Sequence, residues 1–269
     1  MATGNVSAAD LIDLARYPLG DLEAHDGARL VESGRCTIDR DGILVLDGFV
    51  TPDAATLMTA EAEAVAHEAW FCLHRHTVYQ TPGDPDLPAD DARSRLVKSD
   101  KGNVAKDRIP ADGPLRALFD WTPLRSFLAA VLGLHELHPY GDPLAGLMIN
   151  VNRTGETLGW HFDNAEFAVT LMLKPPLAGG TFRYLPGIRS GDAAEHAAVN
   201  RVLEGDETGL IDLAPPAGTL MIFRGRESLH CVTPVIGPQA RLVGVLSYAR
   251  EPGRTMGAQS QRLFHGRVS

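Results

Sequence analysis

The spacing of hydrophobic positions changes near residue 140, and this change predicts the order of the secondary-structure elements. Before it, apolar residues recur at helical spacing, while after it they fall into short runs separated by Gly- and Pro-containing turns. We therefore expect helices first and about seven short strands afterwards. This order favours a mainly β fold with flanking helices, a helix-buttressed sandwich or jelly roll, over alternating strands and helices.

The elements expected in the first half are a strand at 42–50, a helix at 52–70, a strand at 71–81 and a helical stretch at 114–132. Thr51 can cap the first helix, and Pro52 suits its first turn. Pro123 should split the last stretch into two helices. The residues before 42 show no clear period and are expected to be irregular.

The strands expected in the second half are 147–153, 158–164, 167–174, 181–185, 219–223, 230–235 and 242–248. An Ala-rich amphipathic helix near 191–204 is interpreted as an insertion. With 269 residues and 44% hydrophobic residues, the chain can bury one large core. We expect a single domain over 1–269, with a strand-and-helix buttress to about 140 and a jelly-roll core from about 141.

Charge and cysteine usage narrow the possible partners and the compartment. The net charge is -9 and no block of Lys or Arg occurs, so neither nucleic acid nor an anionic membrane is an expected partner. No apolar run approaches the roughly 18 residues of a membrane span. Three scattered cysteines without a Cys-x-x-Cys motif suit a reducing cytoplasm. We expect a small-molecule substrate, and the oligomeric state, monomer or homodimer, stays open.

Three residues on the expected strands have the chemistry of a metal site: His161, Asp163 and His230. On a strand, residues two apart point to the same side, so His161 and Asp163 can converge. Two imidazoles and one carboxylate on one face of a metal are the ligands of non-haem Fe(II) oxygenases. Composition alone predicts about one His-x-acid pair, so the argument depends on the second His of a later strand. The alternative is a solvent-facing pair with His230 in the core.

A single arginine, Arg241, opens the last expected strand. A guanidinium is a rigid fork that pairs with a carboxylate through two parallel hydrogen bonds. We therefore expect Arg241 to bind a carboxylate-bearing co-substrate such as 2-oxoglutarate.

Several short sequence motifs lie between residues 71 and 267: Val78-Tyr79 with Thr81-Pro82, Lys98-Ser99-Asp100-Lys101-Gly102, Tyr140-Gly141-Asp142-Pro143-Leu144, 158–164, Gly179-Gly180-Thr181-Phe182, Phe223-Arg224-Gly225-Arg226, His230-Cys231-Val232-Thr233-Pro234 and Phe264-His265-Gly266-Arg267. Together with the triad, these motifs resemble those of the Fe(II)/2-oxoglutarate-dependent oxygenase superfamily. Within it they resemble the bacterial subgroup that contains free-amino-acid hydroxylases and radical lysine halogenases.

The resemblance implies a double-stranded β-helix, a jelly roll or cupin-like fold, with Fe(II), 2-oxoglutarate and O2 as cofactors. His161, Asp163 and His230 would be the iron ligands and catalytic centre, and Arg241 with Asn150 would bind 2-oxoglutarate. The halogenases of the subgroup have a small residue where this chain has Asp163, which opens an iron position for chloride. The resemblance therefore implies hydroxylation of an amino acid or close derivative rather than halogenation.

Other outcomes stay open at this stage. Desaturation or ring closure in natural-product biosynthesis uses the same ligands and cofactors. A cupin-like metal protein could hold a similar triad without 2-oxoglutarate, but Arg241 would then have no co-substrate to bind. Succinate release that depends on a prime substrate would separate these classes.

The residues expected to contact the substrate are His76, Asp142, Asn164, Arg224, Phe264 and His265. His74 and His76 form either part of the pocket or a second metal pair. Asp142 precedes a proline and is as well suited to a turn, and Arg224 to a structural salt bridge. Lysine-directed relatives have a paired aromatic wall where this chain has Phe264-His265, which leaves the substrate side chain open.

Overall fold

The computed structural model describes residues 7–269. Its α-helices are α1 (Ala8–Leu11), α2 (His25–Asp41), α3 (Pro52–Val65), α4 (Pro114–Asp120), α5 (Thr122–Val131), α6 (Ala193–Leu203) and α7 (Ala258–His265). Two 3-10 turns, η1 (Ala66–Glu68) and η2 (Lys106–Arg108), accompany them. The strands are β1 (Ile43–Leu46), β2 (Trp70–His76), β3 (Val97–Val104), β4 (His138–Pro139), β5 (Leu147–Asn152), β6 (Leu158–His161), β7 (Ala168–Lys174), β8 (Ala178–Gly179), β9 (Phe182–Leu185), β10 (Ile211–Leu213), β11 (Leu220–Phe223), β12 (Leu229–Val232), β13 (Val235–Ile236), β14 (Arg241–Leu246) and β15 (Tyr248–Ala249).

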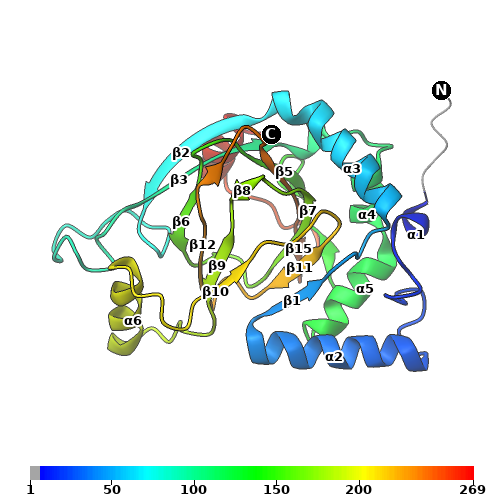
Figure 1. Cartoon of the computed structure of the whole chain (residues 1–269), viewed down its shortest axis with the longest axis horizontal. Coiled ribbons are helices and arrows are strands. Elements are labelled where there is room, and N and C mark those ends of the chain that lie inside the picture. The colour runs from blue at the N-terminus through cyan, green and yellow to red at the C-terminus, as the bar shows by residue number, and fades with distance from the viewer. Residues whose placement is uncertain (1–6) are drawn as a thin grey trace.

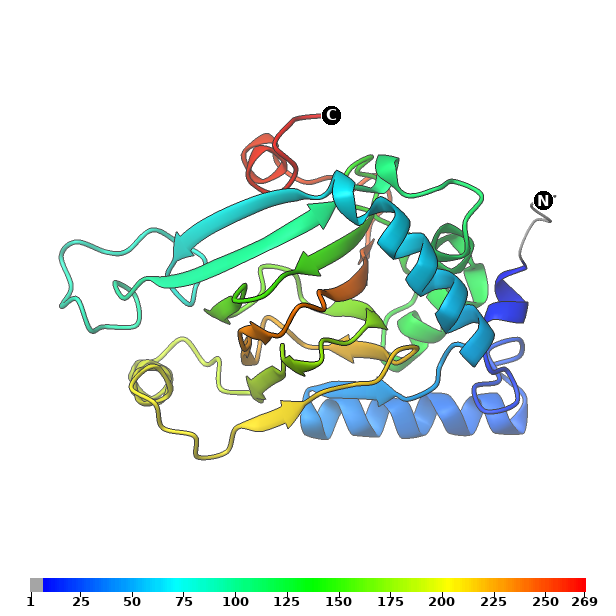
Figure 2. The ribbon, with the colours of Figure 1, turned by 45° about the horizontal axis from the view of Figure 1, so that its top comes forward.

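One antiparallel sheet dominates the molecule and is strongly curled (Figure 1). Its strand order is β1-β11-β7-β14-β5-β3-β6-β12-β9-β10, and β2 extends it by pairing with β3. Helices α2 to α5 gather on one side of the curled sheet, as the tilted view shows (Figure 2). The prediction of a mainly β, jelly-roll fold with flanking helices is confirmed.

The two faces of the sheet carry different side chains because neighbouring residues of a strand point in opposite directions. The outer face packs Leu242 and Leu246 of β14, with residues of β5, β7 and β11, against the helices in the largest hydrophobic core. The inner face carries the residues between them, among them Arg241 and Asn150. The functional residues therefore lie on the face that helices α2 to α5 leave uncovered.

Two local predictions in the first half are confirmed by the structure. The Thr51 hydroxyl accepts a hydrogen bond from the Ala54 backbone N–H at 3.3 Å, and Pro52 is the first residue of α3. The stretch 114–132 forms two helices, α4 and α5, with Pro123 in the first turn of the second. Proline fits there because the first helical N–H groups have no partner within the helix.

The expectation of an irregular N-terminus was wrong over 25–41, where the chain forms the 17-residue helix α2. Its polar residues and two glycines hide the period, since few large apolar side chains mark its buried face. Gly34 explains the packing, because a Cβ there would lie 3.0 Å from the Leu44 side chain and 3.1 Å from that of Val131. Residues 1–6 of the same expectation lie outside the described residues.

The sequence analysis did not predict β3 and α7. β3 mixes charged residues with small and apolar ones, and its central position between β5 and β6 completes the sheet. β1, β2 and β3 all belong to the main sheet, so the part before residue 140 is more than a buttress. Among residues 7–269, no helix has the length and apolar character needed to cross a membrane.

Candidate metal centre

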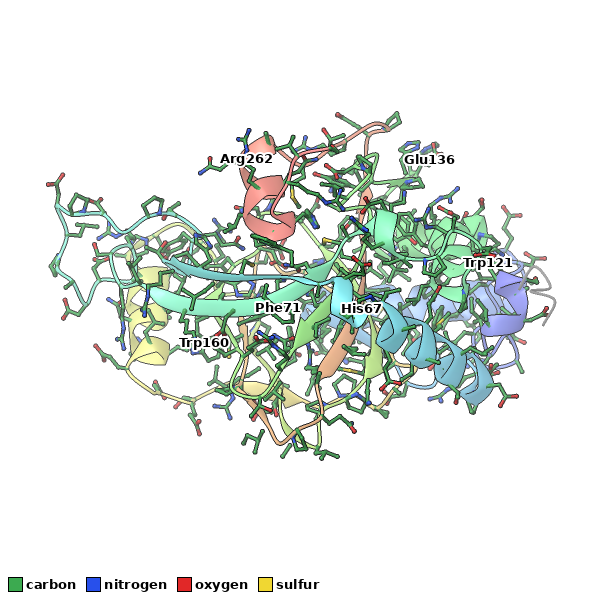
Figure 3. All side chains as sticks on the ribbon, turned by 90° about the horizontal axis from the view of Figure 1, so that it is seen from above. His67, Phe71, Trp121, Glu136, Trp160 and Arg262 are labelled. Atoms are coloured by element: carbon green, nitrogen blue, oxygen red, sulfur yellow. The ribbon has the colours of Figure 1, made fainter. Side chains whose placement is uncertain are left out.

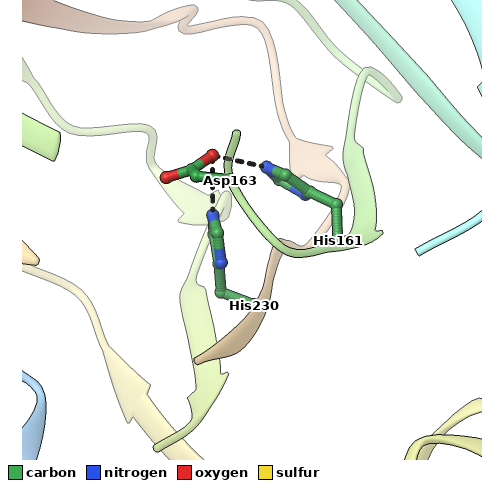
Figure 4. A group of neighbouring side chains, drawn as sticks. All are labelled: His161, Asp163 and His230. Atoms are coloured by element: carbon green, nitrogen blue, oxygen red, sulfur yellow. Dashed lines mark ion pairs between the residues drawn. The ribbon is translucent and has the colours of Figure 1, made fainter. Parts of the chain in front are cut away.

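Two neighbouring strands bring together the triad of His161, Asp163 and His230 (Figure 4). His161 ends β6 and lies directly opposite His230 on β12, with ring centroids 4.1 Å apart. The Asp163 Oδ1 atom lies 3.5 Å from His161 Nε2 and 3.6 Å from His230 Nε2. One ligand atom from each residue falls within 4.8 Å of the others, so a single ion can contact all three.

Backbone carbonyls fix both imidazole rings. His161 Nδ1 lies 2.8 Å from the Gly159 carbonyl oxygen, and His230 Nδ1 lies 2.9 Å from that of Ser228. A proton on each Nδ1 donates these bonds and leaves both Nε2 lone pairs directed at the Asp163 carboxylate. Metal-binding histidines are commonly oriented in this way by a hydrogen bond from the second nitrogen.

Asp163 lies beyond the end of β6, although the sequence analysis placed it on a strand. Its backbone N–H donates to the Gly225 carbonyl at 2.9 Å, and that of Phe162 donates to the Val78 carbonyl at 2.8 Å. Phe162, between the two ligands, is 1% exposed and packs in an apolar cluster with Val78. A Cβ on Gly225 would lie 1.9 Å from Asp163 Oδ2, so this turn accepts the carboxylate only because residue 225 is glycine.

The electrostatics favour metal-binding protonation states at His161 and Asp163. Burial lowers the pKa of His161, and neighbouring His230 lowers it further, so the His161 ring favours the neutral form. Burial alone would raise the pKa of Asp163, but the two histidines hold it well below its usual range. Two neutral imidazoles and one carboxylate fit a divalent transition metal and leave other coordination positions open.

Arg241 is a buried cation on the inner face without a counter-ion. It begins β14, is 4% exposed, and has no salt bridge with any residue of 7–269, and its Nε has no hydrogen-bond partner. Burial lowers its pKa to about 10, which leaves it charged at neutral pH. Because an unpaired buried charge is costly, the position is suited to an anion supplied from outside the chain.

Two asparagines of β5 accompany Arg241. Asn152 lies opposite Arg241 and Asn150 opposite Val243, and both side chains are at most 8% exposed. The Oδ1 atoms of both have no hydrogen-bond partner. Buried polar atoms normally have one, so this part of the inner face has unused capacity for a polar ligand. Asn150 was expected at the co-substrate; Asn152 was missed, although the i+2 spacing of strands could have found it.

Aromatic side chains flank the triad on the side of His230. The ring of Phe223 lies 4.8 Å from that of His230 and the ring of Phe182 lies 5.7 Å away. Both belong to a second apolar cluster on the inner face, formed by Ile43, Phe182, Tyr184, Met221, Phe223 and Val232. This cluster limits the access of water to the centre from that side.

The sequence matches the family model HalD, described as Halogenase D, over residues 28–261. The chain belongs to the Halogenase D family. No curated protein matches it. Its fold is shared with the epimerase SnoN from nogalamycin biosynthesis, described as a non-heme alpha ketoglutarate dependent enzyme (TM-score 0.56, 12% identity, 82% of this chain and 81% of that one).

Two further solved structures have the fold of this Halogenase D family member. AviO1 from Streptomyces viridochromogenes Tue57 matches with a TM-score of 0.55 and 18% identity, over 83% of this chain and 96% of that one. A 2OG-Fe(II) oxygenase family oxidoreductase from Burkholderia pseudomallei matches with 0.52 and 16%, over 83% and 92%. At these identities the likeness shows the fold alone.

In this Halogenase D chain, His76 lies beside the metal site and not in a second one. Its ring is 6.1 Å from that of His161, and its two nitrogens are bonded to the Thr77 carbonyl and the Ser99 hydroxyl, both at 2.8 Å. The neighbouring His74 ring is 4.9 Å away. Within residues 7–269, the triad is the one group of three or more ligand-type side chains close enough to hold a metal.

Asp142 has a structural role in the loop before β5. One carboxylate oxygen accepts from the backbone N–H groups of Leu144 and Ala145, and the other from Met256 and the Gln261 side chain. Burial opposes ionisation, yet these donors hold the pKa of Asp142 below its usual value. Both oxygens are occupied, so the turn alternative is what the structure shows.

Arg224 and Asn164 lie at the edge of the site. The Arg224 guanidinium pairs with Asp39 of α2 at 2.5 Å, which is the structural salt bridge considered above. Asn164 is exposed, and its carbonyl oxygen accepts from Arg226 at 2.6 Å. Its side-chain amide donates to Gln80 at 3.4 Å, which leaves its side-chain oxygen free to accept a hydrogen bond, so it stays a candidate for substrate contact.

Phe264 and His265 belong to α7, which packs beside β2 and β3 (Figure 3). The Phe264 ring centroid lies 5.9 Å from the Lys101 Nζ atom. His265 is 4% exposed, neither ring nitrogen has a hydrogen-bond partner, and burial lowers its pKa. Both remain candidates for the substrate pocket. Lys101 was quoted only within a motif, and no role was inferred for it from the sequence.

Proposed function

We propose that the protein is an Fe(II)/2-oxoglutarate-dependent oxygenase that hydroxylates an unactivated C–H bond of a free amino acid or close derivative. The observation that carries the proposal is the pairing, on one inner face, of a His-Asp-His triad with a buried guanidinium that lacks a counter-ion. A metal protein that did not bind an anionic co-substrate would have no use for Arg241.

The comparisons support Fe(II), 2-oxoglutarate and O2 as the cofactors. SnoN has been crystallised with Fe3+ and alpha ketoglutarate, on the same fold (TM-score 0.55, 14% identity, 82% of this chain and 84% of that one). When bound, iron and 2-oxoglutarate would activate O2 for oxidation of the substrate C–H bond, with succinate and CO2 as co-products.

The protein's own residues would hold and shield these groups. His161, Asp163 and His230 would ligate the metal, held by the carbonyls of Gly159, Ser228 and Gly225. Arg241 and Asn150 would hold the co-substrate: the guanidinium fork would pair with its distal carboxylate. Such pairing fixes orientation as well as charge. The aromatic cluster around His230 would keep water from the reacting centre.

Asp163 favours hydroxylation over chlorination, despite the name of the family. Its carboxylate has two histidine nitrogens within 3.6 Å, and Gly225 leaves room for it. With all three side chains, 2-oxoglutarate and O2 bound to the metal, no coordination position would be left for a halide. Desaturation and ring closure in natural-product biosynthesis are the alternative outcomes, because they need the same ligands.

The substrate and setting follow from the same proposal. His76, Asn164, Phe264 and His265 would line the substrate pocket of a single-domain, cytoplasmic enzyme whose partner is a small amino-acid-like molecule. Because the chain has a net charge of -9, we propose neither nucleic acid nor an anionic membrane as a partner.

The test is a screen of the twenty proteinogenic amino acids with Fe(II), 2-oxoglutarate, O2 and chloride. We expect at least one to trigger succinate formation and to gain one oxygen atom by mass spectrometry. Asp163→Gly should lose hydroxylation and gain chlorination when chloride is high. A chlorinated main product from the unsubstituted protein would overturn the hydroxylase assignment. A rate of succinate formation that no amino acid increases would overturn the substrate class.

A further inference from the structure

The inner face carries a second cation, Lys101 of β3. Register places Asn103 opposite Asn150, and Lys101, two residues earlier on the strand, shares their face. The opposite neighbour of Lys101 is Cys72 on β2. Lys101 therefore lies on the same face of the sheet as Arg241 and near the metal triad, and the charges of Asp163 and Arg241 both act on its pKa.

The ammonium of Lys101 has no partner within residues 7–269. No salt bridge or side-chain hydrogen bond reaches it, whereas Lys98 on the other face of the same strand pairs with Asp100 at 2.5 Å. Burial lowers the pKa of Lys101, Cys72 and Asp163 oppose that shift, and Arg241 adds to it. The Lys101 side chain is partly buried and lies beside the metal triad, so an unpaired cation there is suited to an anion supplied from outside the chain.

The side chains near Lys101 are of kinds that suit a small organic anion. The Phe264 ring provides an apolar wall 5.9 Å from Nζ, and α7, which carries it, is anchored by the Trp70 indole N–H donating to the Leu263 carbonyl at 3.2 Å. His265 adds two nitrogens that have no partner. The carboxylate of Asp142 is unavailable to Lys101 because four donors already occupy its two oxygens.

We propose that Lys101 binds the carboxylate of the prime substrate and makes that carboxylate a requirement for binding. The inference deepens the proposed function and rests on it. A metal and Arg241 together account for both carboxylates of 2-oxoglutarate, so the second unpaired cation of the inner face, Lys101, is left for a second anion. An amino acid supplies one as its α-carboxylate, with the reacting side chain extending toward the triad.

The test compares two matched panels, the twenty proteinogenic amino acids and their primary amides, which lack the negative charge. Binding is measured as thermal stabilisation of the Mn(II)·2-oxoglutarate protein, and turnover as O2-dependent succinate formation with Fe(II). We expect acids to bind and their amides to bind at least about 10-fold more weakly, as the loss of a hydrogen bond between charged groups implies. Lys101→Met should weaken binding of the acid by a similar factor and leave the apparent KM for 2-oxoglutarate within about twofold.

Lys98→Met is the matched control, since it removes a lysine from the opposite face of the same strand and should change neither constant. Lys101→Arg should recover part of the binding. Amides that bind as well as acids would overturn the proposal even if Lys101→Met failed to fold. So would a Lys101→Met variant whose main defect is in the KM for 2-oxoglutarate. Lys101-dependent binding of acids without any succinate formation would support the carboxylate site and overturn the proposed function instead.

Discussion

Gly225→Ala is the change that tests most directly how the metal carboxylate is positioned. The added Cβ would lie 1.9 Å from Asp163 Oδ2 and 2.7 Å from Cγ. Since real Cβ contacts essentially never fall below 3.0 Å, the carboxylate or the turn must move by at least 1.1 Å. Metal–ligand distances tolerate only about 0.2 Å, and a displacement of about 1 Å can reduce turnover on the order of 100-fold. We expect a loss of that size, with weaker metal binding.

The assay is titration of the metal-free protein with Mn(II), followed by succinate formation with Fe(II). Gly20→Ala is the control, because a Cβ at Gly20 meets nothing within 4 Å. In an Asp163→Gly background the clash disappears, so Gly225→Ala should then cost little stability. Metal affinity and turnover within threefold of the unsubstituted protein, in a variant that is folded by circular dichroism, would refute this account of the turn.

Three further predictions follow from other parts of the molecule. His230→Ala should abolish turnover with little change in the unfolding temperature, because the outer core is untouched; undiminished activity would remove His230 from the centre. Arg241→Lys keeps the charge but loses the fork, so the apparent KM for 2-oxoglutarate should rise well beyond twofold. Burial raises the pKa of Glu61 to about 7, so its ionisation should destabilise the fold as pH rises from about 4.5 to about 7. Glu61→Gln should then gain about 1–2 kcal/mol at about pH 8 and little at about pH 5 in urea unfolding; equal effects at both would contradict the shift.

Elements with a strong local signal could be predicted from the sequence. The helix after Thr51 has a cap and a first-turn proline, and the strands from Leu147 onward have apolar runs bounded by glycine and proline. These features act within a few residues, so no distant contact is needed to recognise them.

Elements whose stability comes from distant partners could not be predicted. α2 is mostly polar and depends on the close approach that Gly34 permits. β3 is rich in charge because its inner face lines the site while Asp100 on the other face binds the Thr157 backbone N–H at 2.8 Å. The same limit applies to the site. The spacing of His161 and Asp163 was visible, but the roles of Lys101 and Gly225 depend on neighbours that are remote in the sequence.

One face of the sheet packs the core and the other carries the site, and this separation affects how the sequence can evolve. In β14, Leu242 belongs to the core and Arg241, one residue earlier, to the inner face. Residues that determine thermal stability therefore alternate, along the same strands, with residues that determine which ligand binds. Inner-face side chains can be exchanged in combination while the helices keep their contacts, so new substrates become accessible without a new scaffold.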